Sequence, residues 1–411
     1  MTRFYDDLET RSADQREADL AAALPVFIAA AMERAPALAK HLDGVDPKSV
    51  TGRAALAKLP VLRKSSLSDA QKAAPPFGGF APPPGSTRHV FQSPGPIYEP
   101  GGASRDWWRM GRLLFAAGIG PGDIVQNCFS YHLTPAGMMF ENGAAAVGAS
   151  ILPAGVGQTE LQAEAAAAVG VTAYTGTPDF LKVILDKANE LGLDLSRLKK
   201  AVVGGGALFP SLRAEYADRG VLCIQGYGTA DLGSIAYESP GPDGAVEGMI
   251  VDEGVVVEIV TPGTGDPVAE GEVGEVVVTT FNEDYPLIRF ATGDLSAALP
   301  GTSPCGRTNM RIRGWMGRAD QTTKIKGMFV RPEQVAAFVA RHPEVVKARV
   351  VAGRAGEQDE MTVRVEAEGA DAAALEASVA EVMKLKGKVE LVAPGSLPND
   401  GKVIDDQRSY D

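Results

Sequence analysis

The chain has few cysteines and no long apolar run. Three cysteines occur in 411 residues, at positions 128, 223 and 305, which provides no disulfide framework and is typical of a reducing compartment. No apolar stretch approaches the roughly 18 residues that indicate a membrane span. The first twenty residues are polar and acidic, unlike a signal or transit peptide. These absences predict a cytoplasmic protein without membrane contact.

The chain also lacks an excess of positive charge. It carries 40 Lys and Arg against 52 Asp and Glu, a formal net charge of −12. Such an acidic surface argues against binding to nucleic acid or to an anionic membrane surface. A small phosphorylated ligand stays compatible with this charge, because a local basic pocket can bind an anion.

Several catalytic and metal-binding patterns are missing. The four histidines stand alone, without zinc-ligand spacing, at positions 41, 89, 132 and 342. The sequence contains neither a Gly-x-Ser-x-Gly nucleophile motif nor a Gly-x-x-x-x-Gly-Lys-[Ser/Thr] phosphate loop. A zinc enzyme and a triad hydrolase are therefore disfavoured.

A regular alternation of strands and helices is present from Asp123 to about residue 228. Short apolar runs such as DIVQNCF and VTAYTG alternate with helical patterns such as TPDFLKVILDKANELG. This spacing predicts an α/β fold with parallel strands joined by crossover helices. Ligands bind at the carboxyl ends of such strands, so the loops at Ser130, Gly176, Gly204 and Gly226 are the predicted site of chemistry.

Other segments predict supporting elements. Residues 13–43 have helical spacing with expected breaks at Pro25 and Pro36. Residues 89–102 are expected to form a short strand that runs into a loop. Residues 105–119 predict a helix bearing Trp107 and Trp108, for which packing in the core or a lid is favoured over ligand contact.

Two changes in residue composition and predicted secondary structure divide the chain. Residues 239–280 are rich in β-branched residues with Gly and Pro turns, which predicts a small β-rich subregion. After residue 320 the pattern becomes a compact α+β module of about ninety residues. We therefore expect a large domain at 1–318 and a small domain at 319–411.

Two glycine-rich segments follow strands at the predicted ligand edge. Residues 202–210 contain three consecutive glycines, which allow close approach to a ligand but are explained equally well by a tight turn. Residues 224–233 place Tyr227 between two glycines, with Asp231 four residues further on. An aromatic face beside a carboxylate suits base stacking with a nearby cation, and a turn is again the alternative.

Three further features lie toward the C-terminal end. Thr-Gly-Asp at 292–294 is expected in a turn whose carboxylate can accept two ribose hydrogen bonds, although Gly-Asp is ordinary turn chemistry. Arg318 and Asp320 can be a surface pair that contributes little, and Lys402 can be a solvated tail charge. Each feature taken alone has an ordinary explanation, and only their joint occurrence in this order favours a functional one.

Taken in order, these segments resemble the adenylate-forming acyl-CoA synthetases, and among them the phenylacetate–CoA ligases. The similarity extends over nearly the whole chain, through LAKLPVLRKSSL, QGYGTADLG, YPLIRFATGDL, GRADQTTKIKGMFVRPEQV and VELVAPGSLPNDGKVID. It implies the adenylate-forming fold: a large N-terminal domain with mixed and parallel sheets and a β-rich subregion, and a small mobile α+β C-terminal domain.

The resemblance also implies a two-step reaction that uses ATP, Mg²⁺ and coenzyme A. A small-molecule carboxylic acid, aryl or related, attacks the α-phosphate of ATP to give an acyl-adenylate and pyrophosphate. The small domain then rotates, and the CoA thiolate displaces AMP. Close relatives imply a homodimer.

Matching motifs imply a role for individual residues. Lys402 is the implied catalytic lysine, Asp320 the hinge residue and Asp231 the Mg²⁺ contact. Asp294 and Arg318 are implied at the ribose and phosphate. The rest of the implied nucleotide site comprises Ser93, Gly95, Gly204, Gly205, Gly206, Ala207, Tyr227, Gly228 and Thr229, and the implied acid pocket includes Tyr131 and His132.

The departures from the family pattern gather in the phosphate loop, FQSPGPIYEP at 91–100. Only Ser93, Gly95 and Pro100 match, and Glu99 stands where a lysine is usual. A pyrophosphate cradle works through N–H groups, hydroxyls and positive charge, and a carboxylate beside a triphosphate repels it unless a cation intervenes.

Two interpretations besides the CoA ligase therefore stay open. One is a catalytically impaired or auxiliary protein of the same fold that binds AMP, an acyl-adenylate or acyl-CoA. The other is a ligase that transfers the acyl group to an amine or a carrier thiol. An acid–CoA ligase with an altered phosphate loop is favoured, because random decay would not preserve the ribose and lysine half of the site alone.

Overall fold

The computed structural model describes two compact units. One comprises Met1–Thr292 with Ser296–Trp315, and the other comprises Gly293–Leu295 with Met316–Asp411. The description covers residues 3–82, 85, 87–93, 95–206, 208–316, 319, 323–330, 332–355, 358–397 and 403–408, with the backbone alone at 332, 333 and 336.

The large unit begins with a helical N-terminal segment. The α-helix α1 starts after Ser12, whose side chain accepts a hydrogen bond from the backbone N–H of Gln15. It continues through Pro25, so the predicted break there is wrong; buried Leu24 and Ile28 hold the helix against the core on both sides of the proline. The predicted break at Pro36 is confirmed, because that residue opens α2. The elements of this segment are η1 (Asp7–Thr10), α1 (Ala13–Arg34), α2 (Pro36–His41), η2 (Pro47–Ser49), α3 (Arg53–Leu56), β1 (Leu62–Arg63) and α4 (Lys64–Ala73).

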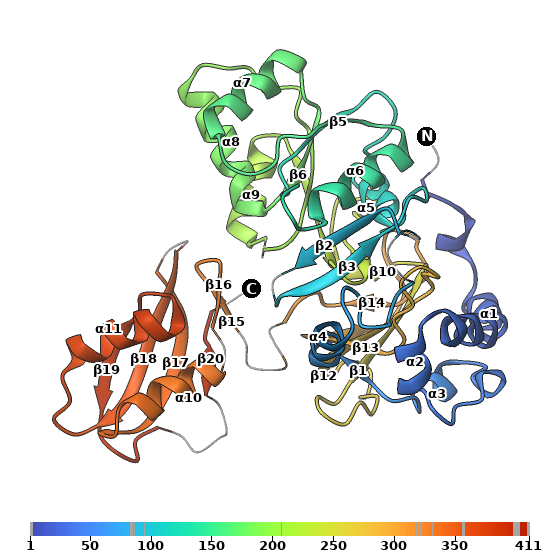
Figure 1. Ribbon diagram of the computed structural model, residues 1–411. Coiled ribbons are helices and arrows are strands. Elements are labelled where there is room, and N and C mark those ends of the chain that lie inside the picture. The colour runs from blue at the N-terminus through green and yellow to red at the C-terminus, as the bar shows by residue number, and fades with distance from the viewer. Residues whose placement is uncertain are drawn as a thin grey trace. The chain divides into compact units, whose positions relative to one another are not determined.

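The predicted alternation of strands and helices is confirmed. Parallel strands lie in the order β8-β7-β6-β4-β5, and helices α7, α8 and α9 lie alongside them (Figure 1). The elements are β4 (Ile124–Asn127), α6 (Ala136–Val147), β5 (Ser150–Leu152), α7 (Thr159–Val169), β6 (Ala173–Gly176), α8 (Pro178–Glu190), β7 (Lys200–Val203), α9 (Pro210–Asp218) and β8 (Leu222–Thr229).

The β-rich region extends the same sheet. Strand β8 turns back into β9, and the order continues as β9-β10-β14-β13-β12-β11, with β1 parallel to β13. Within the described residues this makes one twelve-stranded mixed sheet. The added strands are β9 (Gly233–Tyr237), β10 (Met249–Val251), β11 (Val255–Val260), β12 (Val273–Thr280), β13 (Phe290–Leu299) and β14 (Arg311–Ile312).

Two local predictions are corrected. The helix over 105–119 is only α5 (Met110–Ala116), because Asp106 and Arg109 adopt left-handed backbone angles with φ of 56° and 60°. The tryptophans precede it and are buried, as core packing predicts. Residues 89–102, expected as one strand and a loop, instead contain a hairpin of two antiparallel strands, β2 (His89–Ser93) and β3 (Ile97–Gly101), which pair residue by residue from His89–Gly101 to Ser93–Ile97.

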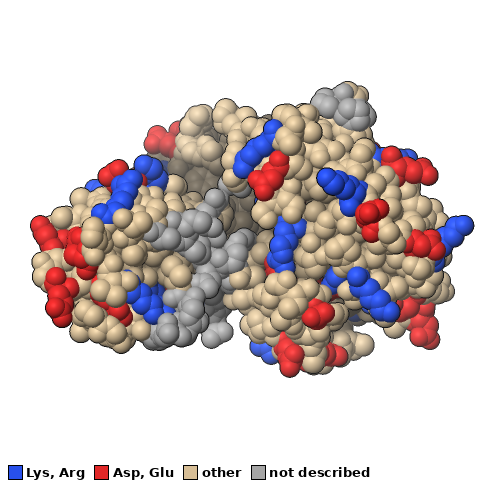
Figure 2. Space-filling view, turned by 60° about the horizontal axis from the view of Figure 1, so that its bottom comes forward, with Lys and Arg blue, Asp and Glu red and all other residues tan. Residues whose placement is uncertain are grey.

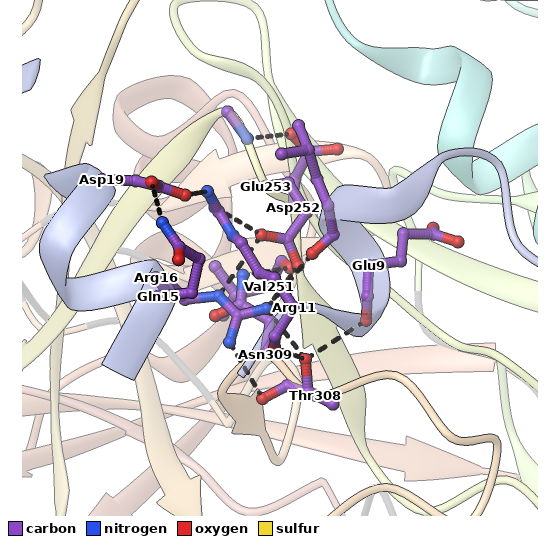
Figure 3. A network of polar contacts seen from close by, with 12 residues as sticks. Glu9, Arg11, Gln15, Arg16, Asp19, Val251, Asp252, Glu253, Thr308 and Asn309 are labelled. Atoms are coloured by element: carbon purple, nitrogen blue, oxygen red, sulfur yellow. Dashed lines mark hydrogen bonds and ion pairs between the residues drawn. The ribbon is translucent and has the colours of Figure 1, made fainter. Parts of the chain in front are cut away.

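A buried polar network fastens the N-terminal segment to the sheet. Arg11 and Arg16 both point at Glu253, with N–O distances of 2.8 Å and 3.0 Å (Figure 3). Arg16 also donates to the hydroxyl of Thr308 at 3.0 Å. Because the Glu253 side chain is only 2% exposed, losing these partners would leave a buried charge without compensation.

The small unit is an α+β module, as predicted. Its main sheet has the order β19-β18-β17-β20, with α10 and α11 packed together against it (Figure 1). Phe338, Val350, Val363 and Val379 are fully buried in its core. The elements are β15 (Thr323–Ile325), β16 (Met328–Val330), α10 (Pro332–Arg341), β17 (Val345–Ala355), β18 (Gln358–Ala367), α11 (Ala372–Met383), β19 (Lys388–Val392) and β20 (Ile404–Asp406).

The described surface carries both signs of charge. Figure 2 shows Lys and Arg side chains interspersed with Asp and Glu on the face that it draws. Among the described residues, no helix is both long and apolar enough to span a bilayer.

Candidate active site

The predicted loops meet at one edge of the sheet. The backbone N–H of Cys128 bonds to the carbonyl of Thr175 at 2.7 Å, and that of Gly204 bonds to Gly176 at 3.1 Å. Val203 pairs in turn with Gln225. The carboxyl ends of β4, β6, β7 and β8 therefore lie side by side, as the strand–helix alternation predicts.

The glycine loop after β7 combines a packed glycine with two exposed ones. A Cβ on Gly204 would lie 3.2 Å from the carbonyl oxygen of Gly226, so this position lies tight against the neighbouring strand. Gly205 has a φ of 69°, a left-handed conformation. The Gly206 carbonyl accepts a bond from the Gln225 amide at 3.1 Å. The loop thus presents exposed backbone at 205 and 206 beside β8. Ala207 lies outside the described residues.

Tyr227 and Gly228 lie at the end of β8. The Tyr227 hydroxyl is 3.3 Å from that of Thr292, which bonds to the Val276 carbonyl at 3.0 Å. A Cβ on Gly228 would lie 2.5 Å from the carbonyl oxygen of Gly233. The hairpin between β8 and β9 therefore requires glycine at 228.

Thr229 and Arg109 hold the turn that follows β8. The hydroxyl of Thr229 accepts a hydrogen bond from the N–H of Leu232 at 3.2 Å. Arg109 donates to the carbonyls of Leu232 and Ser234, the latter at 3.1 Å, and faces Asp252 at 3.4 Å. The sequence offered no indication of this role for Arg109, because its partners lie more than 120 residues away.

Tyr131 is fixed at the end of β4 by a polar residue that sequence reasoning missed. The Asn127 amide donates to the Tyr131 hydroxyl and to the Gly137 carbonyl, both at 2.8 Å, and its oxygen accepts from Thr175 at 3.0 Å. Burial raises the pKa of Tyr131 well above its ordinary value, so its hydroxyl stays protonated. His132, the other predicted pocket residue, is exposed on the following loop. A buried amide at the end of an apolar strand was the available signal for Asn127.

The expected phosphate loop, residues 91–100, comprises the turn of the β2–β3 hairpin and the adjoining parts of both strands. Ser93 is buried on the inner face, whereas Gly95 is exposed at the turn. Glu99 is fully buried, and its carboxyl is hydrogen-bonded to the Ser93 hydroxyl. Burial, and then the charge of Asp231, raise the pKa of Glu99 to about 8 against the opposing effects of Ser93 and Lys64. At neutral pH, Glu99 is therefore mainly an uncharged acid and not the repelling carboxylate that the sequence suggested.

Asp231 is paired with a lysine that sequence reasoning missed. Lys64, the first residue of α4, places its ammonium 2.8 Å from the Asp231 carboxylate, whose side chain is 1% exposed. Among the described residues, no three His, Cys, Asp or Glu side chains gather as metal ligands. One buried carboxylate already engaged with an ammonium does not fit a resident Mg²⁺. The Mg²⁺ contact at Asp231 stays an untested prediction.

The remaining predicted residues are only partly described. Asp294 is buried and lies within β13 after Gly293, whose φ is 76°; the expectation of a turn at 292–294 is therefore wrong, because the strand continues through it. Arg318, Asp320 and Lys402 lie outside the described residues. Their roles stay predictions.

Comparisons with known proteins agree with this arrangement. A family model described as AMP-binding enzyme matches residues 107–282. The phenylacetate–coenzyme A ligase of Thermus thermophilus is 30% identical over 377 residues, covering 88% of this chain and 84% of that protein. The Escherichia coli protein of the same name is also 30% identical, over 383 residues, with the same shares covered.

A solved structure matches the whole chain. The 2-hydroxyisobutyryl-CoA ligase in complex with 2-HIB-AMP and CoA has a TM-score of 0.79 at 24% identity, covering 100% of this chain and 93% of that one. The fold is thus that of the adenylate-forming enzymes. The identity with the curated relatives over most of both lengths shows that the chain belongs to the phenylacetate–coenzyme A ligase family.

Proposed function

We propose that the protein is an ATP-dependent acid–coenzyme A ligase. The observation that carries this proposal is the 30% identity with phenylacetate–coenzyme A ligases across 88% of the chain. In the first step the carboxylate oxygen bonds to the α-phosphorus of ATP and the bond to pyrophosphate breaks. In the second step the CoA sulfur bonds to the acyl carbon and AMP leaves with the electron pair of the broken acyl–oxygen bond.

The sheet edge supports a division of roles among the described residues. Tyr227 and Gly228 would bind the adenine, and the exposed backbone at Gly205 and Gly206 would lie beside it. Tyr131 is a good candidate for the wall of the acid pocket, because Asn127 fixes its hydroxyl. Thr229, Gly204 and Ala207 would shape the nucleotide loops, Ser93 and Gly95 would meet the phosphates, and His132 would lie at the pocket entrance.

The small domain, residues 319–411, would act as the lid. We propose that Lys402 neutralises the charge that develops on the α-phosphate, that Asp294 and Arg318 bind the ribose and phosphate, and that Asp320 is the hinge. A cation delivered by domain closure stabilises the transition state only while the site is shut. Mg²⁺ would arrive bound to the ATP phosphates. A homodimer in the cytoplasm is the assembly and location proposed.

The auxiliary-protein alternative is not favoured. It was based on the departures from the family pattern in residues 91–100, and one of these, the expected repulsion of ATP by Glu99, is weakened because Glu99 is mainly uncharged at neutral pH. The acid used belongs to an aryl or related class.

Pyrophosphate release with a panel of arylacetic, aryl and short hydroxy acids tests the proposal, with Lys402→Ala as the inactive control. We expect release with at least one acid and AMP release that depends on CoA. Release of AMP with an amine acceptor but without CoA would instead identify another acyl transfer. Binding of AMP or CoA with no release for any acid would refute the ligase.

A further inference from the structure

Three ionisable side chains converge at the base of the phosphate hairpin from distant parts of the chain. Lys64 comes from α4, Glu99 from β3 and Asp231 from the turn between β8 and β9. The Lys64 ammonium lies 2.8 Å from one oxygen of Asp231. The other oxygen of Asp231 and one oxygen of Glu99 are buried without a hydrogen-bond partner in the described structure.

We propose that Lys64 is the fixed cation of the phosphate site and that Asp231 is the residue that positions it, in place of a metal-binding carboxylate. This inference rests on the proposed function, because it names how the same site meets the triphosphate. It also identifies a cation that could contact the phosphates although position 99, where the family carries a lysine, is a glutamate.

The surroundings of Asp231 favour an ammonium over a divalent ion. Mg²⁺ requires near-octahedral coordination by oxygens at about 2.0–2.1 Å. The Asp231 side chain is 1% exposed and, because Lys64 already contacts one of its oxygens, it has a single oxygen left for a metal ion. A dication bound at the other oxygen would lie close to that ammonium and be repelled by it. The ion pair with Lys64 compensates the negative charge of the buried carboxylate without a metal.

Lys64 is placed to act together with the hairpin. Gln71, on the same helix, accepts from the backbone N–H of Tyr98 at 2.9 Å and donates to its carbonyl at 2.8 Å. These two hydrogen bonds join α4 to β3 at the residue before Glu99. The Lys64 side chain is 35% exposed, so its ammonium can hold Asp231 on one side and contact a phosphate oxygen on the other.

Nucleotide binding without turnover tests the proposal. The α,β-methylene analogue of ATP and AMP itself are titrated into the full-length protein and into Lys64→Gln, Asp231→Asn and the double variant. We expect each single variant to bind the ATP analogue about 10- to 100-fold more weakly, the range of one hydrogen bond to a charged group. AMP should be affected far less, and the double variant should be no weaker than the weaker single variant, because one contact is lost in each case. The matched control is Lys72→Gln, on the exposed face of α4.

A second arm measures metal binding directly. Mn²⁺ is added to the nucleotide-free protein and followed by electron paramagnetic resonance. We expect no bound Mn²⁺ that depends on Asp231. Mn²⁺ that binds to the native protein and is lost in Asp231→Asn would overturn the proposal, as would additive losses of nucleotide affinity in the double variant.

A variant that does not fold, and a protein without ligase activity, can both be distinguished from a wrong inference about Lys64. If Lys64→Gln does not fold, Lys64→Arg, which keeps the positive charge, should bind the ATP analogue more tightly than Asp231→Asn does. Unchanged affinity in Lys64→Gln and Asp231→Asn contradicts the inference even if the protein activates an acid. The affinity pattern can equally hold when no acid is activated, in which case only the proposed function fails.

Discussion

Replacing Glu99 by glutamine should make the large unit more stable at alkaline pH and leave it nearly unchanged at pH 5. Burial raises the pKa of Glu99 to about 8 from its ordinary value of 4.5. Below pH 4.5 the folded and unfolded chains both hold the proton. Between pH 4.5 and 8 mainly the folded chain holds the proton, so the free energy of unfolding falls as pH rises. Above pH 8 the carboxyl is ionised in both states, and the folded chain bears the full free-energy cost of the buried charge.

The magnitude follows from that difference. About 3.5 pH units, at about 1.4 kcal/mol each, give an upper limit of ~5 kcal/mol for the cost of ionising Glu99 in the folded state. Glutamine has nearly the same shape, is uncharged at every pH and can still accept the hydrogen bond from Ser93. The Glu99→Gln variant should therefore escape the whole of this cost.

Differential scanning calorimetry from pH 5 to pH 9 measures the effect. At about 2 °C per kcal/mol for a unit of this size, the melting temperature of Glu99→Gln should exceed that of the native protein by up to about 10 °C at pH 9. The control is Glu270→Gln, at an exposed glutamate. A difference in melting temperature between Glu99→Gln and the native protein that stays constant from pH 5 to pH 9 would refute the description of Glu99 as a buried neutral acid.

Three further substitutions test other parts of the site. Gly228→Ala places a methyl group 2.5 Å from the Gly233 carbonyl and should destabilise the large unit by about 1–3 kcal/mol in chemical unfolding, whereas Gly353→Ala, which meets nothing within 4 Å, should not. Asn127→Leu removes the hydrogen bond to the strand-end tyrosine and should raise KM for the acid more than KM for ATP; equal increases would count against an acid pocket there. Asp320→Pro should slow thioester formation more than adenylation in single-turnover assays, and equal losses would argue against the hinge.

The alternating part of the fold could be predicted because its signal is local. Each strand from β4 to β8 is a short apolar run, and each connecting helix repeats with a helical period. The points at which helices begin and end were less predictable, because they depend on tertiary packing. Pro25 does not end α1, since buried side chains flank it, and the left-handed residues before α5 have no distinctive sequence pattern.

The site could be predicted only where one segment carries the function. Tyr131 lies on the loop after β4 and Tyr227 lies near the end of β8, as their positions after apolar runs indicate. Lys64 could not be found in this way, because its partner Asp231 is 167 residues away. The residue type of Glu99 predicted a negative charge, but the orientation of its side chain could not be predicted. The hairpin turns the carboxyl inward, where burial and a neighbouring acid keep it protonated.

Acid-dependent release of pyrophosphate is the most direct measurement of acid–CoA ligase activity. The purified protein is incubated with ATP, Mg²⁺ and each acid of the panel, with and without CoA, and pyrophosphate, AMP and the thioester are quantified together. We predict pyrophosphate release with at least one acid, followed by equal amounts of AMP and acyl-CoA when CoA is present. No pyrophosphate with any acid, from protein that binds AMP normally, would contradict it.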